Sequence, residues 1–263
     1  MGAPEALIEH FRACGYHPRS DKHSNCLAEA IVADLRRHCP RIREKLDAGS
    51  LVYDLNFTIL AGQAEWNVDL VFGPPALSAS PATPRQAPSR IEVAVEIKAV
   101  MTEHRKAAKN RKRDLEAHHE HVHNYDNLAI AGGVLLINAA PTFRSPLRPA
   151  PTEHKNPLRL VEHCVEELRR VAVRGGSTGY GLEAKCAVVV DADNINLPTA
   201  RLIQQPPRHR SVTRFITTHS SRQSATTTGG ASPALTRASS PSASPCPCPP
   251  GSTPPPRPRP AAP

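Results

Sequence analysis

Three charged residues at two places in the chain have side chains that could carry out hydrolysis together. Asp69 lies in the segment EWNVDLVFG, and Glu96 and Lys98 lie in the segment IEVAVEIKAV. Carboxylate oxygens are the ligands that Mg²⁺ prefers, and a bound divalent cation stabilises charge on a phosphoryl group and activates water. A lysine beside them can orient that water and offset the charge of the transition state. The three residue types therefore indicate metal-assisted hydrolysis of a phosphate ester.

Both segments have the alternating pattern of β-strands, which would bring these side chains together. Successive side chains of a strand point to opposite faces, so Glu92, Ala94, Glu96 and Lys98 are expected on one face. Glu96 and Lys98 would then lie about 7 Å apart. Asp69 is expected on the polar face of the preceding strand. In an antiparallel meander this face is continuous with the face that carries Glu96.

The order of the remaining elements predicts a mixed α/β (or α+β) domain. A helix from Ser24 to about Lys45, kinked or divided at Pro40, precedes three strands that contain SLVYDLNFTIL, EWNVDLVFG and IEVAVEIKAV. The rest of the order consists of a polar helix at 102–124, a strand at 133–138, a helix at 157–171 and a strand at 185–191. The order α-βββ-α-β-α-β predicts a mixed central sheet flanked by helices.

Two details of the later helices are expected from their sequences. Thr102 is a candidate N-cap for the polar helix, because a threonine side chain can accept a hydrogen bond from the first helical turn. The helix PLRLVEHCVEELRRV is amphipathic, and four apolar residues are expected to face inward, namely Leu158, Val161, Val165 and Leu168.

This constellation, D69 followed by E96-I-K98 on adjacent strands after an opening helix, resembles the PD-(D/E)xK nuclease superfamily, to which many type II restriction endonucleases belong. The resemblance covers about residues 24–138, and Val68 stands where the motif has proline. It implies a restriction-endonuclease-like fold, with Asp69 and Glu96 as metal ligands and Lys98 as the catalytic lysine. The backbone carbonyl of Ile97 would be a further ligand. Glu29 on the opening helix is a candidate additional ligand.

The activity implied by the resemblance is that of a metal-dependent deoxyribonuclease. Such an endonuclease would hydrolyse DNA phosphodiester bonds with Mg²⁺, for which Mn²⁺ can substitute, and it would act on duplex DNA as a homodimer. Two alternatives stay open. One is a nuclease of the same fold that works in repair, recombination or phage processing. The other is a nucleic-acid-binding module without catalysis, which would have no need for acids beside phosphates.

The helix that follows Lys98 carries a dense group of cations. Lysine and arginine next to a hydrolytic site would supply contacts to phosphates, which give affinity that depends on salt and not on base sequence. A solvated helix face is the alternative interpretation of such a charge run. The candidate nucleic-acid-binding residues are Arg105, Lys106, Lys109, Arg111, Lys112 and Arg113.

The end of the same helix contains four histidines, His118, His119, His121 and His123. His119 and His123 are four residues apart and could both bind zinc from one helical face. No third ligand is evident nearby and no HExxH arrangement is present, so surface or DNA-contacting histidines are favoured over a zinc site.

Composition separates a folded part from a tail. Residues 206–263 are mostly Pro, Ser, Thr, Ala and Arg, a composition that buries too little apolar surface to fold, so one domain is expected over residues 1–205. Residues 201–263 hold eight arginines and no Lys, Asp or Glu. Without these eight, 25 basic residues stand against 24 acidic ones, so the net charge of +9 comes almost entirely from the tail. No apolar run reaches the ~20 residues that span a membrane, and a reduced, cytoplasmic setting is expected.

Overall fold

The computed structural model describes residues 2–15, 21–61, 64–76, 83–145, 148–195 and 199–204. The predicted tail, residues 206–263, lies outside the described residues. Among the described helices, none is long and apolar enough to cross a membrane.

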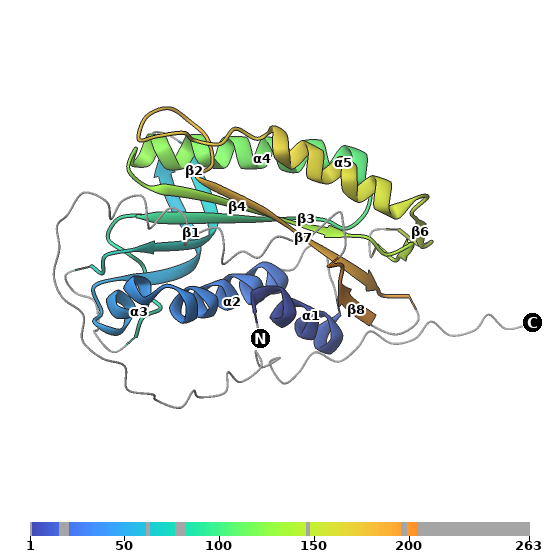
Figure 1. Ribbon diagram of the computed structural model, residues 1–263, viewed down its shortest axis with the longest axis horizontal. Helices are drawn as coiled ribbons and strands as arrows, with labels where there is room; N and C mark the ends of the chain where they lie inside the picture. The colour runs from blue at the N-terminus through green and yellow to red at the C-terminus, as the bar shows by residue number, and fades with distance from the viewer. Residues whose placement is uncertain are drawn as a thin grey trace, which may run out of the picture.

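A six-stranded sheet lies between two layers of helices (Figure 1). Its strand order is β1-β2-β3-β4-β7-β8, and the strands are β1 (Val52–Ala61), β2 (Ala64–Gly73), β3 (Val93–Val100), β4 (Ile130–Asn138), β7 (Ala184–Asp193) and β8 (Thr199–Leu202). A short hairpin is formed by β5 (Thr142–Phe143) and β6 (Thr152–Glu153). This confirms the predicted mixed α/β sheet flanked by helices.

The helices are divided between the two faces of the sheet. Figure 1 shows α1, α2 and α3 below the sheet and α4 and α5 above it. Their bounds are Ala3–Cys14 for α1, Lys22–His38 for α2, Pro40–Asp47 for α3, His104–Tyr125 for α4 and Pro157–Arg170 for α5. The first helix was not expected from the sequence, whereas the predicted division at Pro40 is confirmed.

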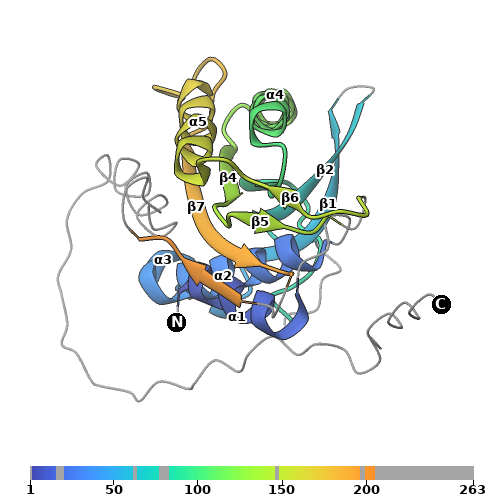
Figure 2. The same cartoon turned by 90° about the vertical axis from the view of Figure 1, so that its right-hand side faces the viewer.

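Strand direction changes at β3. Strands β1, β2 and β3 form the predicted antiparallel meander, while β3, β4 and β7 are parallel. Because parallel neighbours need a crossover connection, α4 joins β3 to β4 and α5 lies between β4 and β7. Both crossover helices pack side by side on the same face (Figure 2). The acids of β2 and β3 therefore lie where the antiparallel and parallel halves meet.

Each face of the sheet has its own apolar core. Below the sheet, Leu27, Ile31 and Leu35 of α2 pack with Leu70 and Phe72 of β2, and all five are buried. Above it, the core is formed around α4 and α5, with Ala94, Leu115, Val122, Val161 and Leu168 among its residues. The helix stripe predicted at Leu27, Ile31 and Leu35 is thus confirmed.

Two expectations about the upper helices are wrong. Helix α4 begins at His104, and the capping position is Glu103, with φ of 50° and no side-chain cap hydrogen bond, so Thr102 is not the N-cap. In α5, Val161 and Leu168 face inward as predicted, but Leu158 is exposed. Leu158 lies in the first turn, directly after Pro157, at the outer end of the helix, so amphipathic spacing alone does not bury it.

Gly133 lets α4 approach the sheet beside Glu96. The two residues are direct partners in the parallel pairing of β3 and β4. A Cβ atom at Gly133 would lie 2.9 Å from Cδ1 of Leu182 and 3.0 Å from Cδ2 of Leu115, so these leucine side chains would have to shift to accept it. The missing side chain therefore makes room for Leu115, and α4 packs over the middle of β3.

Candidate active site

The three residues singled out from the sequence meet where β2 and β3 separate. The two strands pair only from Leu70 to Phe72 and from Val93 to Val95, and Asp69 is the next residue of β2. The backbone N–H of Ile97 donates a hydrogen bond of 2.7 Å to Oδ2 of Asp69. A carboxylate thus takes the place of a backbone acceptor at the point where β2 and β3 separate, which we call the fork. Beyond it, the β1–β2 hairpin rises away from the sheet beside α4 (Figure 2).

The neighbouring strand is also distorted at this level. Asn56 of β1, which faces Asp69 in the register, has a left-handed φ of 52° and is missing from the otherwise regular pairing. Asparagine accepts this conformation more readily than most residues. Its side chain donates to Oδ1 of Asn25 at 2.9 Å, which ties the fork to the start of α2.

Glu96 lies almost completely buried in the floor of the site. Its side chain is 1% exposed, and the ammonium group of Lys98 contacts its Oε1 directly. Burial, followed by the negative charge of Asp69, raises the pKa of Glu96 to about 7. A carboxyl group whose ionisation is opposed by a second carboxyl group is suited to a partner with more than one positive charge.

Asp69 and Lys98 complete the charged cluster. Burial raises the pKa of Asp69, against the stabilising effects of the Ile97 N–H, the Lys98 charge and the Ser24 hydroxyl. Burial alone would lower the pKa of Lys98, but the charge and hydrogen bond of Glu96 outweigh it, and the pKa is raised. Lys98 therefore remains charged at neutral pH, and its side chain is 25% exposed. Lys98 is thus more accessible to solvent than its partner Glu96.

Helix α4 places two further residues near Glu96, His118 and Asp114, and the sequence reasoning assigned neither of them to this site. His118 is fully buried, its Nε2 lies 3.4 Å from the carbonyl oxygen of Ala94, and its Nδ1 lies 3.9 Å from Oε2 of Glu96. Burial lowers the pKa of His118 to about 3, so the ring is neutral and this contact is not an ion pair at pH 7. Asp114, one turn before His118, is close enough to raise the pKa of both Glu96 and Lys98.

The oxygen atoms of the cluster fit a hard divalent cation. Oε2 of Glu96 is buried and, among the described residues, no group donates a hydrogen bond to it. Asp69 accepts hydrogen bonds from the Ile97 N–H and the Ser24 hydroxyl, and a carboxylate has acceptor sites beyond these two. Carboxylate oxygens with unused acceptor capacity are what Mg²⁺ or Mn²⁺ requires. No set of three or more His, Cys, Asp or Glu side chains within the described ranges has the spacing of a metal site, so the residues would supply two carboxylates and would need other oxygen ligands.

Glu29 is held by other partners. Its Oε2 accepts a hydrogen bond of 2.9 Å from the Tyr53 hydroxyl, and its Oε1 pairs with Arg85 at 2.8 Å. Both carboxylate oxygens are thus engaged beside β1. The structure brings Asp69, Glu96 and Lys98 together, and a metal-binding role for Glu29 stays a prediction, as does the role of the Ile97 carbonyl.

The six cations predicted on α4 fall into two groups in the structure, because two form ion pairs within the helix and four are exposed. Arg111 pairs with Asp114 at 2.7 Å, and Lys112 pairs with Glu116 at 2.8 Å. The four other residues, Arg105, Lys106, Lys109 and Arg113, are exposed. The exposed cations can bind phosphates directly, whereas Arg111 and Lys112 would first have to break their ion pairs with Asp114 and Glu116.

The histidine cluster is mostly buried, which corrects the expectation of surface or DNA-contacting histidines. His118, His119 and His123 are each at most 5% exposed. His121 stacks on Trp66 of the β1–β2 hairpin, with ring centroids 4.7 Å apart. The expectation failed because α4 turns this end toward the sheet and the hairpin, so that histidine provides packing there instead of contact with solvent.

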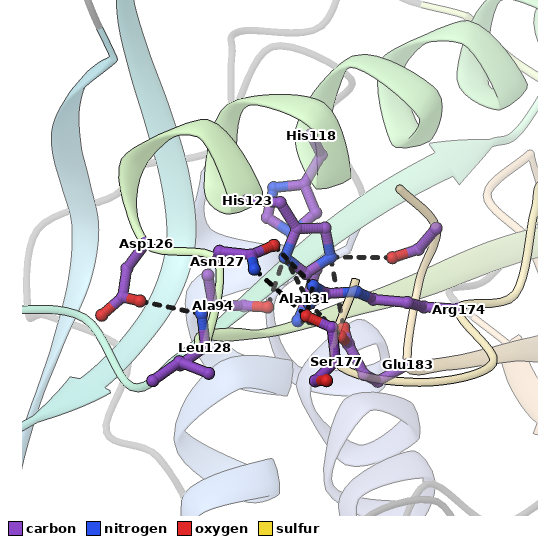
Figure 3. A network of polar contacts seen from close by, with 11 residues as sticks. Ala94, His118, His123, Asp126, Asn127, Leu128, Ala131, Arg174, Ser177 and Glu183 are labelled. Atoms are coloured by element: carbon purple, nitrogen blue, oxygen red, sulfur yellow. Dashed lines mark hydrogen bonds and ion pairs between the residues drawn. The ribbon is translucent and has the colours of Figure 1, made fainter. Parts of the chain in front are cut away.

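A buried polar network fixes the end of α4 to the segment before β7 (Figure 3). Arg174 is 5% exposed and donates to Oε1 of Glu183, to Oδ1 of Asn127 and to the carbonyl oxygen of Ser177. Its Nη1 lies 3.0 Å from Nδ1 of His123, whose Nε2 lies 2.9 Å from the carbonyl oxygen of Gly181. The network thereby positions the helix that covers Glu96.

The raised pKa of Glu96 gives a test in the absence of metal. An unfolded chain loses this proton near pH 4.5 and the folded chain near pH 7, so between these values the folded state binds more protons. Stability must then fall as pH rises through this window, by at most ~3 kcal/mol. Glu96→Gln removes the titrating group. In EDTA, urea unfolding should show the variant gaining stability relative to wild type from pH 5 to pH 8. A difference in unfolding free energy between the two proteins that does not change with pH would contradict the raised pKa of Glu96.

No family model, curated protein or solved structure matches the chain.

Proposed function

We propose that the chain is a Mg²⁺-dependent endonuclease that hydrolyses phosphodiester bonds of DNA in the manner of restriction-like nucleases. The observation that carries the proposal is the meeting of Asp69, Glu96 and Lys98 at the β2–β3 fork. Two carboxylates with raised pKa and a charged lysine in one partly accessible cluster suit hydrolysis of a phosphate ester. A face made only for solvation has no need for a buried acid such as Glu96.

Each residue has a separate role in this proposal. Asp69 and Glu96 hold the divalent cation, which supplies charge stabilisation at the phosphoryl group and a water of lowered pKa when bound. Lys98 donates hydrogen bonds to the attacking water or to the phosphate oxygens, where its charge offsets the developing negative charge. The hydrogen bond from the Ile97 N–H fixes the Asp69 carboxylate, and His118 of α4 lies against Glu96 on the side away from bulk water.

Exposed cations on α4 would add to the affinity for DNA. Arg105, Lys106, Lys109 and Arg113 are exposed on the helix that covers Glu96. Contacts of this kind contribute affinity that falls as salt rises and that does not depend on base sequence. Mn²⁺ is expected to replace Mg²⁺, because both accept oxygen ligands in octahedral arrangements.

Lys98→Ala is expected to reduce cleavage of supercoiled plasmid about 100-fold or more, because a positioned donor is lost where charge develops. Gel assays with Mg²⁺ and with EDTA would measure this. Lys45→Ala is the matched control, since Lys45 is also a partly exposed lysine that contacts a glutamate, 4.0 Å from Glu92. Full activity of Lys98→Ala would remove the proposed role of the lysine, whereas loss of activity in both variants would indicate a nonspecific effect of charge.

The same assay separates the alternative functions. Discrete fragments from linear DNA indicate site-specific cutting, as in restriction, whereas nicking or end degradation indicates a repair, recombination or phage-processing role. Binding without cleavage under any divalent cation would favour the non-catalytic binding module.

A further inference from the structure

A second cluster of cations lines a pocket between α4 and α5. The pocket has a volume of about 480 Å³, and Arg105 and Lys109 of α4 line it from one side. Lys155, which precedes α5, and Arg159 and His163 of the first half of α5 line the other side. Among the described residues, no carboxylate is part of the lining. The sequence reasoning grouped Arg105 and Lys109 with their neighbours on α4 and missed the contribution of α5.

The positive charge of this pocket is not balanced within the described part of the chain. Arg105, Lys109, Lys155 and Arg159 form no ion pair with any described residue. Most other cations of the two helices are paired, since Arg111 and Lys112 contact acids of α4, and Arg169 and Arg170 contact acids of α5. Four like charges around one pocket repel one another, so an anion that enters it relieves this repulsion.

One further residue at the pocket, His163, has a polar atom without a partner among the described residues. Nε2 of His163 is shielded from solvent, and within the described ranges it has no hydrogen-bond partner. The pocket thus combines charge with an unused polar atom. Phosphate, with several acceptor oxygens and up to two negative charges near neutral pH, matches both properties better than a carboxylate does.

The pocket is separate from the candidate active site. Asp114, which lies near Glu96 and Lys98, follows Lys109 by five residues and Arg105 by nine. At 3.6 residues per turn, these separations place Asp114 about 140° and 180° around the helix from the two pocket residues. The pocket therefore opens on the α5 side of α4, away from the fork, and its ligand is not the phosphate at the site of hydrolysis.

We propose that the pocket between α4 and α5 is a phosphate-binding site. Its ligand is a phosphate group, either free, as in inorganic phosphate and small phosphate esters, or carried by a nucleic acid strand outside the cleavage site. The pocket uses none of the residues at the fork, so phosphate binding there does not depend on hydrolysis, although Arg105 and Lys109 are also among the α4 cations proposed to add to the affinity for DNA.

Titration calorimetry of the full chain with inorganic phosphate, at constant ionic strength, tests the site. Saturable binding is expected, and Arg159→Ala and Lys109→Ala should each weaken it at least tenfold. Arg169→Ala is the matched control, since Arg169 is an exposed arginine of α5 outside the pocket, and it should bind phosphate as wild type does. Glu96→Gln should also bind phosphate normally, so failure of the nuclease proposal and failure of this site can be told apart.

Competition identifies the source of the phosphate. Displacement by a 5′-phosphorylated oligonucleotide but not by its 5′-hydroxyl form indicates a strand end, and displacement by both indicates internal phosphates. Displacement by neither indicates a small phosphate compound. Absence of saturable phosphate binding, or equal affinity of wild type, Arg159→Ala and Lys109→Ala, would overturn the proposal.

Discussion

Glu96→Gln is expected to reduce Mg²⁺-dependent DNA cleavage by at least ~10³-fold, the largest effect of any single substitution at the fork. The amide keeps the size of the side chain but loses the charge that would hold the cation. Because Glu96 is buried and its pKa is already near 7, a neutral group at this position suits the protein interior. Folding should therefore be retained, and cleavage rates on plasmid DNA measure the effect.

Glu92→Gln provides the matched control for this substitution. Glu92 was expected on the same strand face as Glu96, but it precedes β3 and pairs with Arg90 at 2.8 Å and with Lys45 of α3 at 4.0 Å. Its loss should leave cleavage within about twofold of wild type, as is usual for exposed ion pairs remote from a site. Equal activity of Glu96→Gln and wild type would show that hydrolysis, if present, takes place elsewhere.

Arg174→Ala is expected to destabilise the protein by about 3–5 kcal/mol, because it leaves the buried Glu183 carboxylate without its cation. Glu183 is a buried partner at 3.0 Å, and its Oε2 also accepts a hydrogen bond from the backbone N–H of Ala131. The substitution also removes the donors to Asn127 and Ser177 (Figure 3). Urea unfolding monitored by circular dichroism would measure the change.

The control for this prediction is Arg169→Ala. Arg169 is 73% exposed and lies 3.5 Å from Glu166, so its loss should cost less than about 1 kcal/mol. The double variant Arg174→Ala/Glu183→Ala should recover part of the stability, since no carboxylate is then buried without a partner. A small effect of Arg174→Ala alone would mean that the network does not hold the end of α4.

The sequence was sufficient to predict the elements that position the candidate site. Alternation in the three strands and the stripe at Leu27, Ile31 and Leu35 identified the meander and the helix below it, because these patterns reflect burial directly. The convergence of Asp69, Glu96 and Lys98 followed from the strand faces. The separation of β2 from β3 was not predicted, since no pattern indicated the left-handed Asn56 or the hydrogen bond that Asp69 accepts from Ile97.

The contribution of α4 to the candidate site, and of α4 and α5 to the separate pocket, could not be predicted for a different reason. The contact of His118 with Glu96, and the position of Asp114 close enough to affect the pKa of Glu96, depend on the rotation of α4 over the sheet, which is set by packing. Gly133 was a sequence feature that could have indicated this packing, because a glycine inside a strand often marks a place where another element approaches closely. The pocket needs residues from two helices about 50 positions apart in the chain, and only the tertiary structure brings Lys109 and Arg159 together.

The central claim is tested most directly by incubating supercoiled plasmid with the full chain, in parallel with Glu96→Gln purified by the same procedure, in Mg²⁺ and in EDTA. The account predicts nicked or linear DNA with the wild-type protein in Mg²⁺, and intact plasmid in EDTA and with the variant. Intact plasmid with wild type in both Mg²⁺ and Mn²⁺, or equal cleavage by the variant, would contradict the assignment of the fork as a nuclease site.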